Sequence, residues 1–223
     1  MEKYGNYMKN SCKIYLVRHG ESLGNAMVMF LGHTDLDLSE LGYKQANATA
    51  MALSNIHFDK IYSSELCRAY NTALPHAKMR GLDVEARKNL REVYVGAWEG
   101  KRCTEISEKY GDLYHIDWHE KYGTFVFPEG DSVIDAGKRF HDEVLKIAKE
   151  NIGKTILIAS HGAVIRSSWA MISGISSEDI AQALPFPTNA SYSVLEFDGE
   201  RLIPIEYSCD THLSDIGITQ IKF

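Results

Sequence analysis

Two strand-like runs that each lead into a histidine and a glycine constrain the fold of this chain more than any other feature. The first covers residues 13–18 and leads into His19-Gly20, and the second covers residues 155–159 and leads through Ser160 into His161-Gly162. The second run is short and apolar, which is typical of a strand buried on both faces in a parallel sheet. Ligands bind beyond the carboxyl ends of such strands, so two neighbouring strands would bring both histidines to one crevice.

The rest of the chain alternates strand-like and helix-like segments, which favours an α/β sheet over a helical bundle or a β-sandwich. Strands are expected over 13–18, 58–62, 155–159 and 189–197, with the last of these closing the core, and helices over 39–55, 64–79, 104–110 and 131–152. The stretch 101–130 is aromatic and rich in histidine, and we interpret it as a lid.

Two of the expected helices have serine at the position of an N-cap. Ser39 precedes the first helix, with Leu38 and Tyr43 spaced as a hydrophobic staple. Ser64 is expected to cap the second, which places Arg68 in its first turns, where free N–H groups favour an anion.

Composition limits the classes of partner. A chain of 223 residues with 44% apolar content can bury one sizeable core, so we expect a single domain over 1–223, with the lid subregion at about 101–130. The formal net charge of −6 disfavours binding to nucleic acid or to an anionic membrane surface. The expected partner is a small molecule, and oligomers are compatible with the sequence.

The four cysteines are spaced unlike a zinc site or a disulfide scaffold. Free thiols in a reducing compartment are the simpler interpretation. The chain begins with polar residues and contains no apolar run of the length that a membrane span needs. We therefore expect a cytoplasmic protein.

Further motifs accompany the two histidine motifs in a fixed order. They are Arg18-His19-Gly20-Glu21-Ser22 with Asn25, Gly32-His33-Thr34-Asp35, Ser63-Ser64-Glu65-Leu66-Cys67-Arg68, Leu90-Arg91-Glu92, Gly96-Ala97-Trp98-Glu99-Gly100 and Ser160-His161-Gly162. With these motifs the chain resembles the histidine phosphatase superfamily, in its phosphoglycerate-mutase-like branch and especially the cofactor-independent phosphatases there. The resemblance implies a three-layer α/β/α sandwich with a mostly parallel central sheet and a small lid insertion.

The resemblance also implies a mechanism without metal or cofactor. A phosphomonoester would be hydrolysed through a phosphohistidine on His19, because neutral imidazole is a good nucleophile near pH 7. Glu92 would be the general acid, and repulsion from a bound phosphate dianion favours its protonated form. The residues expected to bind the substrate are Arg18, Asn25, Gly32, Arg68, His161 and Gly162.

Several roles have alternatives. Glu99 competes with Glu92 for the role of acid, but we expect it to stabilise a turn. Gly20 would let the backbone approach the phosphate, and Glu21 would orient the His19 ring. His161 would have to be partly protonated to assist, a form that a bound phosphate favours.

A metal site is a weaker interpretation of the lid. His115 and His119 lie four residues apart, near Asp117 and Glu120, and two imidazoles at this spacing share one helix face. No further ligands follow at a recognisable spacing, so a polar lid face is the simpler interpretation.

Two other functions remain open. A phosphoglycerate mutase would return the phosphoryl group to a bound sugar acid, and a non-catalytic protein would bind a phosphorylated ligand without turnover. The resemblance favours the phosphatase, because the region after Glu92 lacks the long basic insertion of the glycolytic mutases.

The chain departs from many of its relatives at the mouth of the expected site. Met29 and Leu31 stand where many family phosphatases have arginine and glutamine, and Asp37 stands where they have proline. We hypothesise that the mouth is more apolar and favours a bulky or aromatic leaving group over a small acidic one.

Overall fold

A computed structural model describes residues 11–218. Its centre is one sheet with the strand order β3-β2-β4-β1-β5-β6. The strands are β1 (Cys12–Arg18), β2 (Lys60–Ser63), β3 (Val84–Ala86), β4 (Thr155–Ser160), β5 (Tyr192–Phe197) and β6 (Leu202–Cys209). The four strands from β3 to β1 run parallel, while β5 and β6 are antiparallel additions. The mostly parallel sheet is confirmed.

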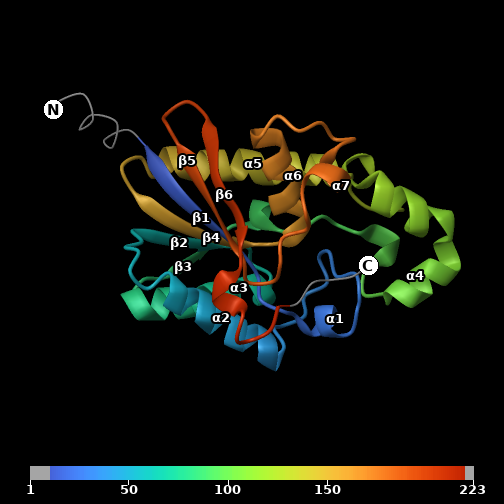
Figure 1. The fold of residues 1–223 in the computed structure, drawn as a ribbon, viewed down its shortest axis with the longest axis horizontal. Helices are drawn as coiled ribbons and strands as arrows, with labels where there is room; N and C mark the ends of the chain where they lie inside the picture. The colour runs from blue at the N-terminus through green and yellow to red at the C-terminus, as the bar shows by residue number, and fades with distance from the viewer. Residues whose placement is uncertain (1–10, 219–223) are drawn as a thin grey trace.

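Helices cover both faces of the sheet, which confirms the three-layer sandwich (Figure 1). The α-helices are α1 (Leu23–Ala26), α2 (Glu40–Ala52), α3 (Cys67–Arg80), α4 (Cys103–Tyr110), α5 (Val133–Glu150), α6 (Gly162–Ile172) and α7 (Ile180–Ala183). Helices α2 and α3 lie on one side of the sheet, and α5 and α6 lie on the other.

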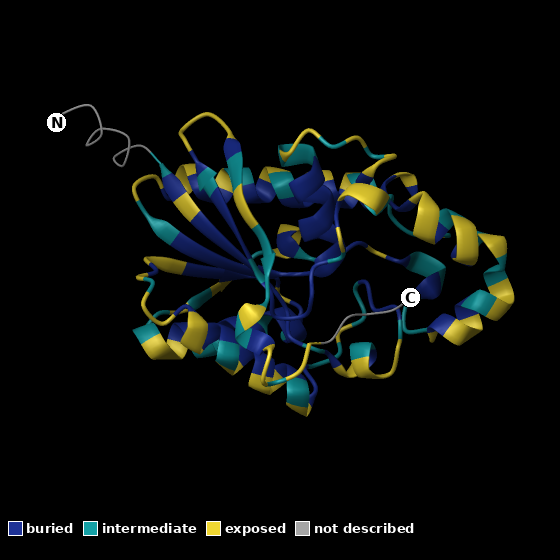
Figure 2. Ribbon diagram, in the orientation of Figure 1, coloured by how far each residue is buried: buried dark blue, intermediate teal, exposed yellow. Residues whose placement is uncertain are grey.

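The alternation of side chains along strand β1 explains how both faces of the sheet are packed. Ile14 and Leu16 belong to the core shared with α5 and α6. Tyr15 and Val17 belong to the second core, beneath α2 and α3. Successive side chains of a strand point to opposite faces, so a run that is apolar at each of these positions serves two helix layers. Figure 2 shows the resulting burial of the sheet between exposed outer helix faces.

The expected cap of α2 is confirmed, and that of α3 is wrong. The Ser39 hydroxyl accepts from the N–H of Gly42. Helix α3 begins later than expected, at Cys67, because Ser64 still continues the strand ladder through its N–H to the carbonyl of Ala159. The Asp35 carboxylate accepts from the N–H of Cys67 at 2.8 Å instead. A distant loop therefore supplies the partner that we expected from Ser64.

The strand expected over 189–197 starts at Tyr192 and is not the last one. Strand β6 pairs with it at the edge of the sheet, and Pro204 lies within β6. An edge strand tolerates proline because one of its sides needs no ladder donors. Strand β6 was not predicted because it contains a proline and half-exposed side chains, and so lacks the apolar pattern of a buried strand.

The segment 101–130 contains α4, a π-helix over Leu113–Trp118 and a 3-10 turn over Tyr122–Thr124. The helix expected over 104–110 is confirmed. The segment lies beyond one end of the sheet (Figure 1). Within the described residues, no helix is both long and apolar enough to cross a membrane.

The chain after β6 packs against α2. The Gln45 amide donates to the carbonyl of Gly217, and the Thr49 hydroxyl lies 3.0 Å from Nε2 of His212. Residues 219–223 lie outside the described part of the chain.

Candidate active site

The two histidine motifs meet because β1 and β4 are adjacent and in register, with Arg18 beside Ser160. The N–H of His19 donates to the carbonyl of Ser160 at 2.9 Å. The rings of His19 and His161 then lie edge to face, with centroids 5.2 Å apart. The expectation that the neighbouring strands bring the two histidines together is confirmed, and His19 is the one that lines the pocket.

His19 is fixed in one tautomer by its own loop. Its Nδ1 lies 2.7 Å from the carbonyl oxygen of Gly20. Because a carbonyl oxygen only accepts, Nδ1 carries the proton and Nε2 keeps its lone pair. Burial, together with the charges of Arg68 and Arg18, lowers the pKa of His19 well below its usual value. The ring is therefore neutral near pH 7, as a nucleophile requires.

The expected role of Glu21 is wrong. The Glu21 carboxylate accepts from the Ser39 hydroxyl at 2.6 Å, so it ties the loop to the start of α2. The Gly20 carbonyl orients His19 instead. Gly20 also has a packing role that we did not predict, since a Cβ there would lie 2.5 Å from the carbonyl oxygen of Gly42.

Arg68 projects from the first turn of α3 and is only 1% exposed. Its two terminal nitrogens donate to the carbonyls of Thr34 at 2.9 Å and Gly32 at 2.8 Å. Its Nε is buried and has no protein partner. Burial lowers the pKa of this guanidinium, and the charge of Glu92 opposes that shift.

Glu99 supports the loop that holds Arg68. Its carboxylate accepts from the N–H groups of His33 at 2.8 Å and Thr34 at 2.7 Å. Gly32 has a φ of +43°, and a Cβ there would lie 2.0 Å from the Glu99 carboxylate. The structural role expected for Glu99 is confirmed, and Gly32 contributes through its backbone.

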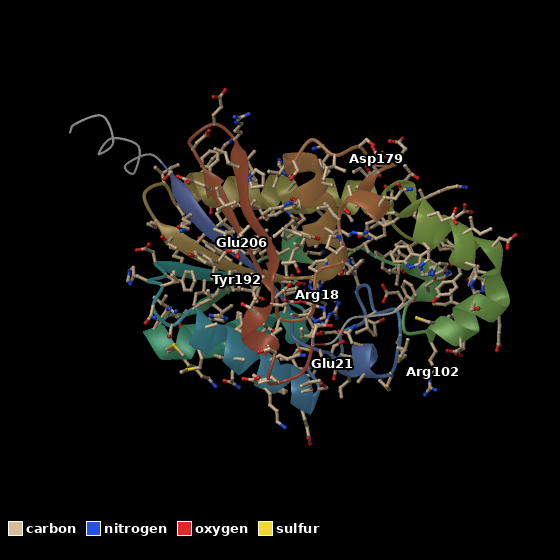
Figure 3. The ribbon with its side chains drawn as sticks, viewed as in Figure 1. Arg18, Glu21, Arg102, Asp179, Tyr192 and Glu206 are labelled. Atoms are coloured by element: carbon tan, nitrogen blue, oxygen red, sulfur yellow. The ribbon has the colours of Figure 1, made fainter. Side chains whose placement is uncertain are left out.

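Arg18 is held by a different loop, the one that contains Phe186 and Pro187. One of its terminal nitrogens donates to the carbonyl of Pro187, and its Nε is buried without a protein partner. Its guanidinium lies 5.4 Å from the ring centre of Phe186. Burial, against the charge of Glu92, lowers the pKa of Arg18 to about 10, so it stays charged at neutral pH. Figure 3 shows Arg18 in the interior of the molecule, at the end of β1.

His161 is fully buried, and neither ring nitrogen has a protein partner. Burial and the charges of Arg68, His19 and Arg18 lower its pKa well below the usual value. The site by itself thus favours the neutral form, whereas the protonated form was expected in the presence of a bound phosphate. A neutral imidazole still offers one N–H donor.

Asn25 is oriented by a residue that we did not predict. Its side-chain oxygen accepts from the N–H of Ser22 at 3.1 Å and from the Asn189 amide at 3.0 Å, which leaves its NH₂ as a donor. Asn189 also donates to the carbonyls of His19 and Gly20. Because β5 is antiparallel to β1, the residues before β5 lie beside this loop, and that pairing was not apparent from the sequence.

Glu92 lies at the N-terminus of α6. Its carboxylate accepts from the N–H groups of Ala163 at 3.0 Å and Val164 at 3.2 Å. Arg139 of α5 donates to its backbone carbonyl at 2.9 Å. Gly162 allows close packing here, since a Cβ on it would lie 2.4 Å from Phe186.

One pocket joins these residues to an apolar surface. We call Arg18, His19, Asn25, Arg68 and Glu92 its polar end. Its apolar end consists of Met29, Phe30, Leu31, Val93, Val95, Trp118, Phe127 and Phe186. Met29 and Leu31 were predicted to lie at the mouth, whereas Trp118, Phe127 and Phe186 were missed because only tertiary packing brings them there.

The expected lid histidines belong to a polar surface. Nε2 of His115 lies 2.8 Å from the Ser107 hydroxyl, and Asp117 pairs with Lys121 at 2.6 Å. In the part of the chain that the structure describes, no group of three or more His, Cys, Asp or Glu side chains is arranged to hold a metal ion.

Comparison with known proteins supplies independent information. Residues 14–210 match the histidine phosphatase superfamily (branch 1). The chain is 33% identical to a metal-independent phosphoserine phosphatase of Arabidopsis thaliana, over 95% of this chain and 87% of that protein. It is 29% identical to a 2,3-bisphosphoglycerate-dependent phosphoglycerate mutase of Bifidobacterium longum, over 86% and 92%. The structure of Bacillus stearothermophilus YhfR superimposes with a TM-score of 0.85 at 26% identity, covering 91% of this chain and 99% of that one.

Proposed function

The chain belongs to branch 1 of the histidine phosphatase superfamily, and we propose from this premise that it hydrolyses small phosphomonoesters with His19 as the nucleophile. One observation carries the assignment of the residues. A neutral histidine with a free Nε2 lies beside His161 and close to two buried guanidiniums that each keep an unpartnered Nε. Fixed cationic donors of this kind stabilise a transferring phosphoryl group.

The proposed reaction has two steps. Nε2 of His19 attacks the phosphorus, the bond to the ester oxygen breaks, and Glu92 gives its proton to that oxygen, so a neutral alcohol leaves. Water then attacks the phosphohistidine, Glu92 takes a proton from the water, and phosphate is released. Arg18, Arg68, His161 and the Asn25 amide would donate to the non-bridging oxygens throughout.

We also propose that residues 1–223 form one domain and that the segment at about 101–130 is its lid. The segment supplies Trp118 and Phe127 to the apolar end of the pocket. All four cysteines are free thiols, which supports the proposed location in a reducing cytoplasm.

A phosphoglycerate mutase is the second candidate, since a mutase is among the relatives. Such an enzyme must also hold the carboxylate of a sugar acid. Among the described residues, the cationic side chains that line the pocket are Arg18 and Arg68 alone, and both lie at the polar end. This distribution of charge favours hydrolysis.

The test is release of inorganic phosphate from p-nitrophenyl phosphate in excess chelator, by the native protein and by His19→Ala. We expect release by the native protein and none above background by the variant. A mutase would instead transfer the phosphoryl group to 3-phosphoglycerate, and a non-catalytic protein would bind phosphate without any release. Activity that survives in His19→Ala would contradict the assignment of the nucleophile.

A further inference from the structure

The apolar end of the pocket constrains the leaving group, given the proposed function. Phe30, Trp118 and Phe127 are each at most 5% exposed. Their rings contact one another, with centroids 5.5 Å apart for Phe30 and Trp118 and 5.2 Å apart for Trp118 and Phe127. This surface comes from two distant parts of the chain, and it lines the same pocket as the two guanidiniums.

The positive charge at the other end is matched to one phosphate group. Arg18 and Arg68 are both anchored to backbone carbonyls, and each retains a buried Nε without a protein partner. Two guanidiniums balance one phosphate dianion. Met29 and Leu31, which flank Phe30, bring no charge to the mouth.

Other cations near the pocket are directed elsewhere. Arg102 is paired through its backbone with Met29, but its side chain is exposed and points outward from α4 (Figure 3). Arg166 contacts the ring of Phe186, and its guanidinium is already bonded to the carbonyl of Leu184. A carboxylate on the leaving group would thus find no cationic partner at the apolar end. An ammonium there would find no acidic one, because Glu92, the acidic side chain among the described lining residues, lies at the polar end. Burial of either charge without a partner is strongly unfavourable.

We propose that the preferred substrates are phosphomonoesters of uncharged, apolar alcohols, above all those that carry an aromatic ring, and that Trp118 and Met29 set this preference. An aromatic guest extends the edge-to-face packing of the rings that line the pocket and gains from the burial of its own surface. An apolar leaving group of this kind differs from serine, the alcohol that hydrolysis of phosphoserine, named for the plant relative, releases.

The test compares three primary alkyl esters with related leaving groups, 2-phenylethyl phosphate, phosphoethanolamine and O-phospho-L-serine. All release a primary alcohol, so they differ mainly in what the pocket must accommodate. We expect kcat/KM for 2-phenylethyl phosphate to exceed that of each charged ester by at least about 10-fold. Equal or faster hydrolysis of phosphoserine would overturn the proposal and leave the phosphatase assignment intact. If p-nitrophenyl phosphate is not hydrolysed either, the proposed function fails first.

Two variants test the residues. Trp118→Ala should lower kcat/KM for 2-phenylethyl phosphate about 10-fold more than it lowers kcat/KM for ethyl phosphate. An equal loss on both substrates would show that Trp118 has only a structural role.

The second variant is Met29→Arg. Position 29 is half-buried, so it accommodates a long side chain more readily than the buried position of Trp118 would. This variant should raise the ratio of phosphoserine to 2-phenylethyl phosphate hydrolysis by about 10-fold, whereas the neutral Met29→Gln should not. Met51→Arg is the matched control, since Met51 is 64% exposed on α2 and does not line the pocket. An unchanged ratio in Met29→Arg would contradict the assignment of this residue.

Discussion

The two ends of the pocket are built by different means. At the polar end, Arg68 is held by backbone carbonyls of the loop before α2, and Arg18 by a backbone carbonyl of the loop between α7 and β5. At the apolar end, Trp118 and Phe127 are held by ring packing, in a segment without any of the six strands of the sheet. Hydrogen bonds fix direction, while packing fixes shape. The comparison suggests that reactivity resides at one end and choice of substrate at the other.

Among the variants, Arg68→Ala is expected to cause the largest loss of activity. Its loss removes a buried charge that faces the phosphoryl group, so kcat/KM should fall by about 1,000-fold on every substrate. Steady-state kinetics on p-nitrophenyl phosphate and ethyl phosphate measure this effect. Lys78→Ala is the control on the same helix, because Lys78 is exposed. A loss confined to one substrate would place Arg68 in substrate choice and break the comparison.

The loss of kcat/KM in Glu92→Gln should depend on whether the leaving group needs a proton and not on the shape of the substrate. A phenolate such as p-nitrophenolate leaves without a proton, whereas an alkoxide needs one. We expect kcat/KM to fall by at least about 100-fold for ethyl phosphate and far less for p-nitrophenyl phosphate. Glutamine also disturbs the bonds to Ala163 and Val164, but that disturbance would affect both esters equally. Equal losses would therefore reject Glu92 as the general acid.

Acid should destabilise the fold through a buried histidine that does not line the pocket. His76 of α3 is fully buried, and burial followed by the charges of Arg80 and His212 lowers its pKa from 6.5 to about 3. Between these values the unfolded state binds more protons, so stability is fully present above pH 6.5 and declines as the pH falls toward 3. At pH 5 this residue alone should cost about 2 kcal/mol of unfolding free energy.

His76→Leu tests this, with unfolding by urea at pH 7 and pH 5. Between pH 7 and pH 5, the unfolding free energy of the variant should fall by about 2 kcal/mol less than that of the native protein. His57→Leu is the control, because the side chain of His57 is 86% exposed. The same pH dependence in native protein and His76→Leu would show that His76 is not the responsible group.

The smallest effect is expected at the lid histidines. His115→Ala and His119→Ala, or prolonged dialysis against a chelator, should leave kcat/KM for p-nitrophenyl phosphate unchanged. Loss of activity on dialysis, restored by a divalent metal, would overturn the metal-independent mechanism.

The sequence predicted the polar end well because its signals are local. Arg18 ends β1, and His19 and His161 directly follow β1 and β4, so the parallel pairing of those strands is enough to bring them together. Among the described residues, four of the six strands and four of the seven α-helices followed from the sequence pattern, whereas β3, β6, α1, α6 and α7 did not. The start of α3 did not, because its cap comes from Asp35, which is remote in sequence.

The apolar end could not be predicted in the same way. Aromatic residues such as Trp118 and Phe186 have no spacing that distinguishes a pocket wall from ordinary core, and their place depends on how the lid packs. Asn189 was missed for a related reason, since its bonds to His19 and Gly20 arise from the antiparallel addition of β5.

The central claim is that the phosphoryl group passes through His19, and Glu92→Gln gives the most direct view of it. With p-nitrophenyl phosphate, transfer to His19 needs no acid, but hydrolysis of the phosphohistidine needs the base that the variant lacks. Rapid quenching at alkaline pH followed by peptide mass mapping should find one acid-labile phosphoryl group on the peptide that contains His19. A phosphoryl group on another residue, or phosphate release without any trapped intermediate, would contradict the account.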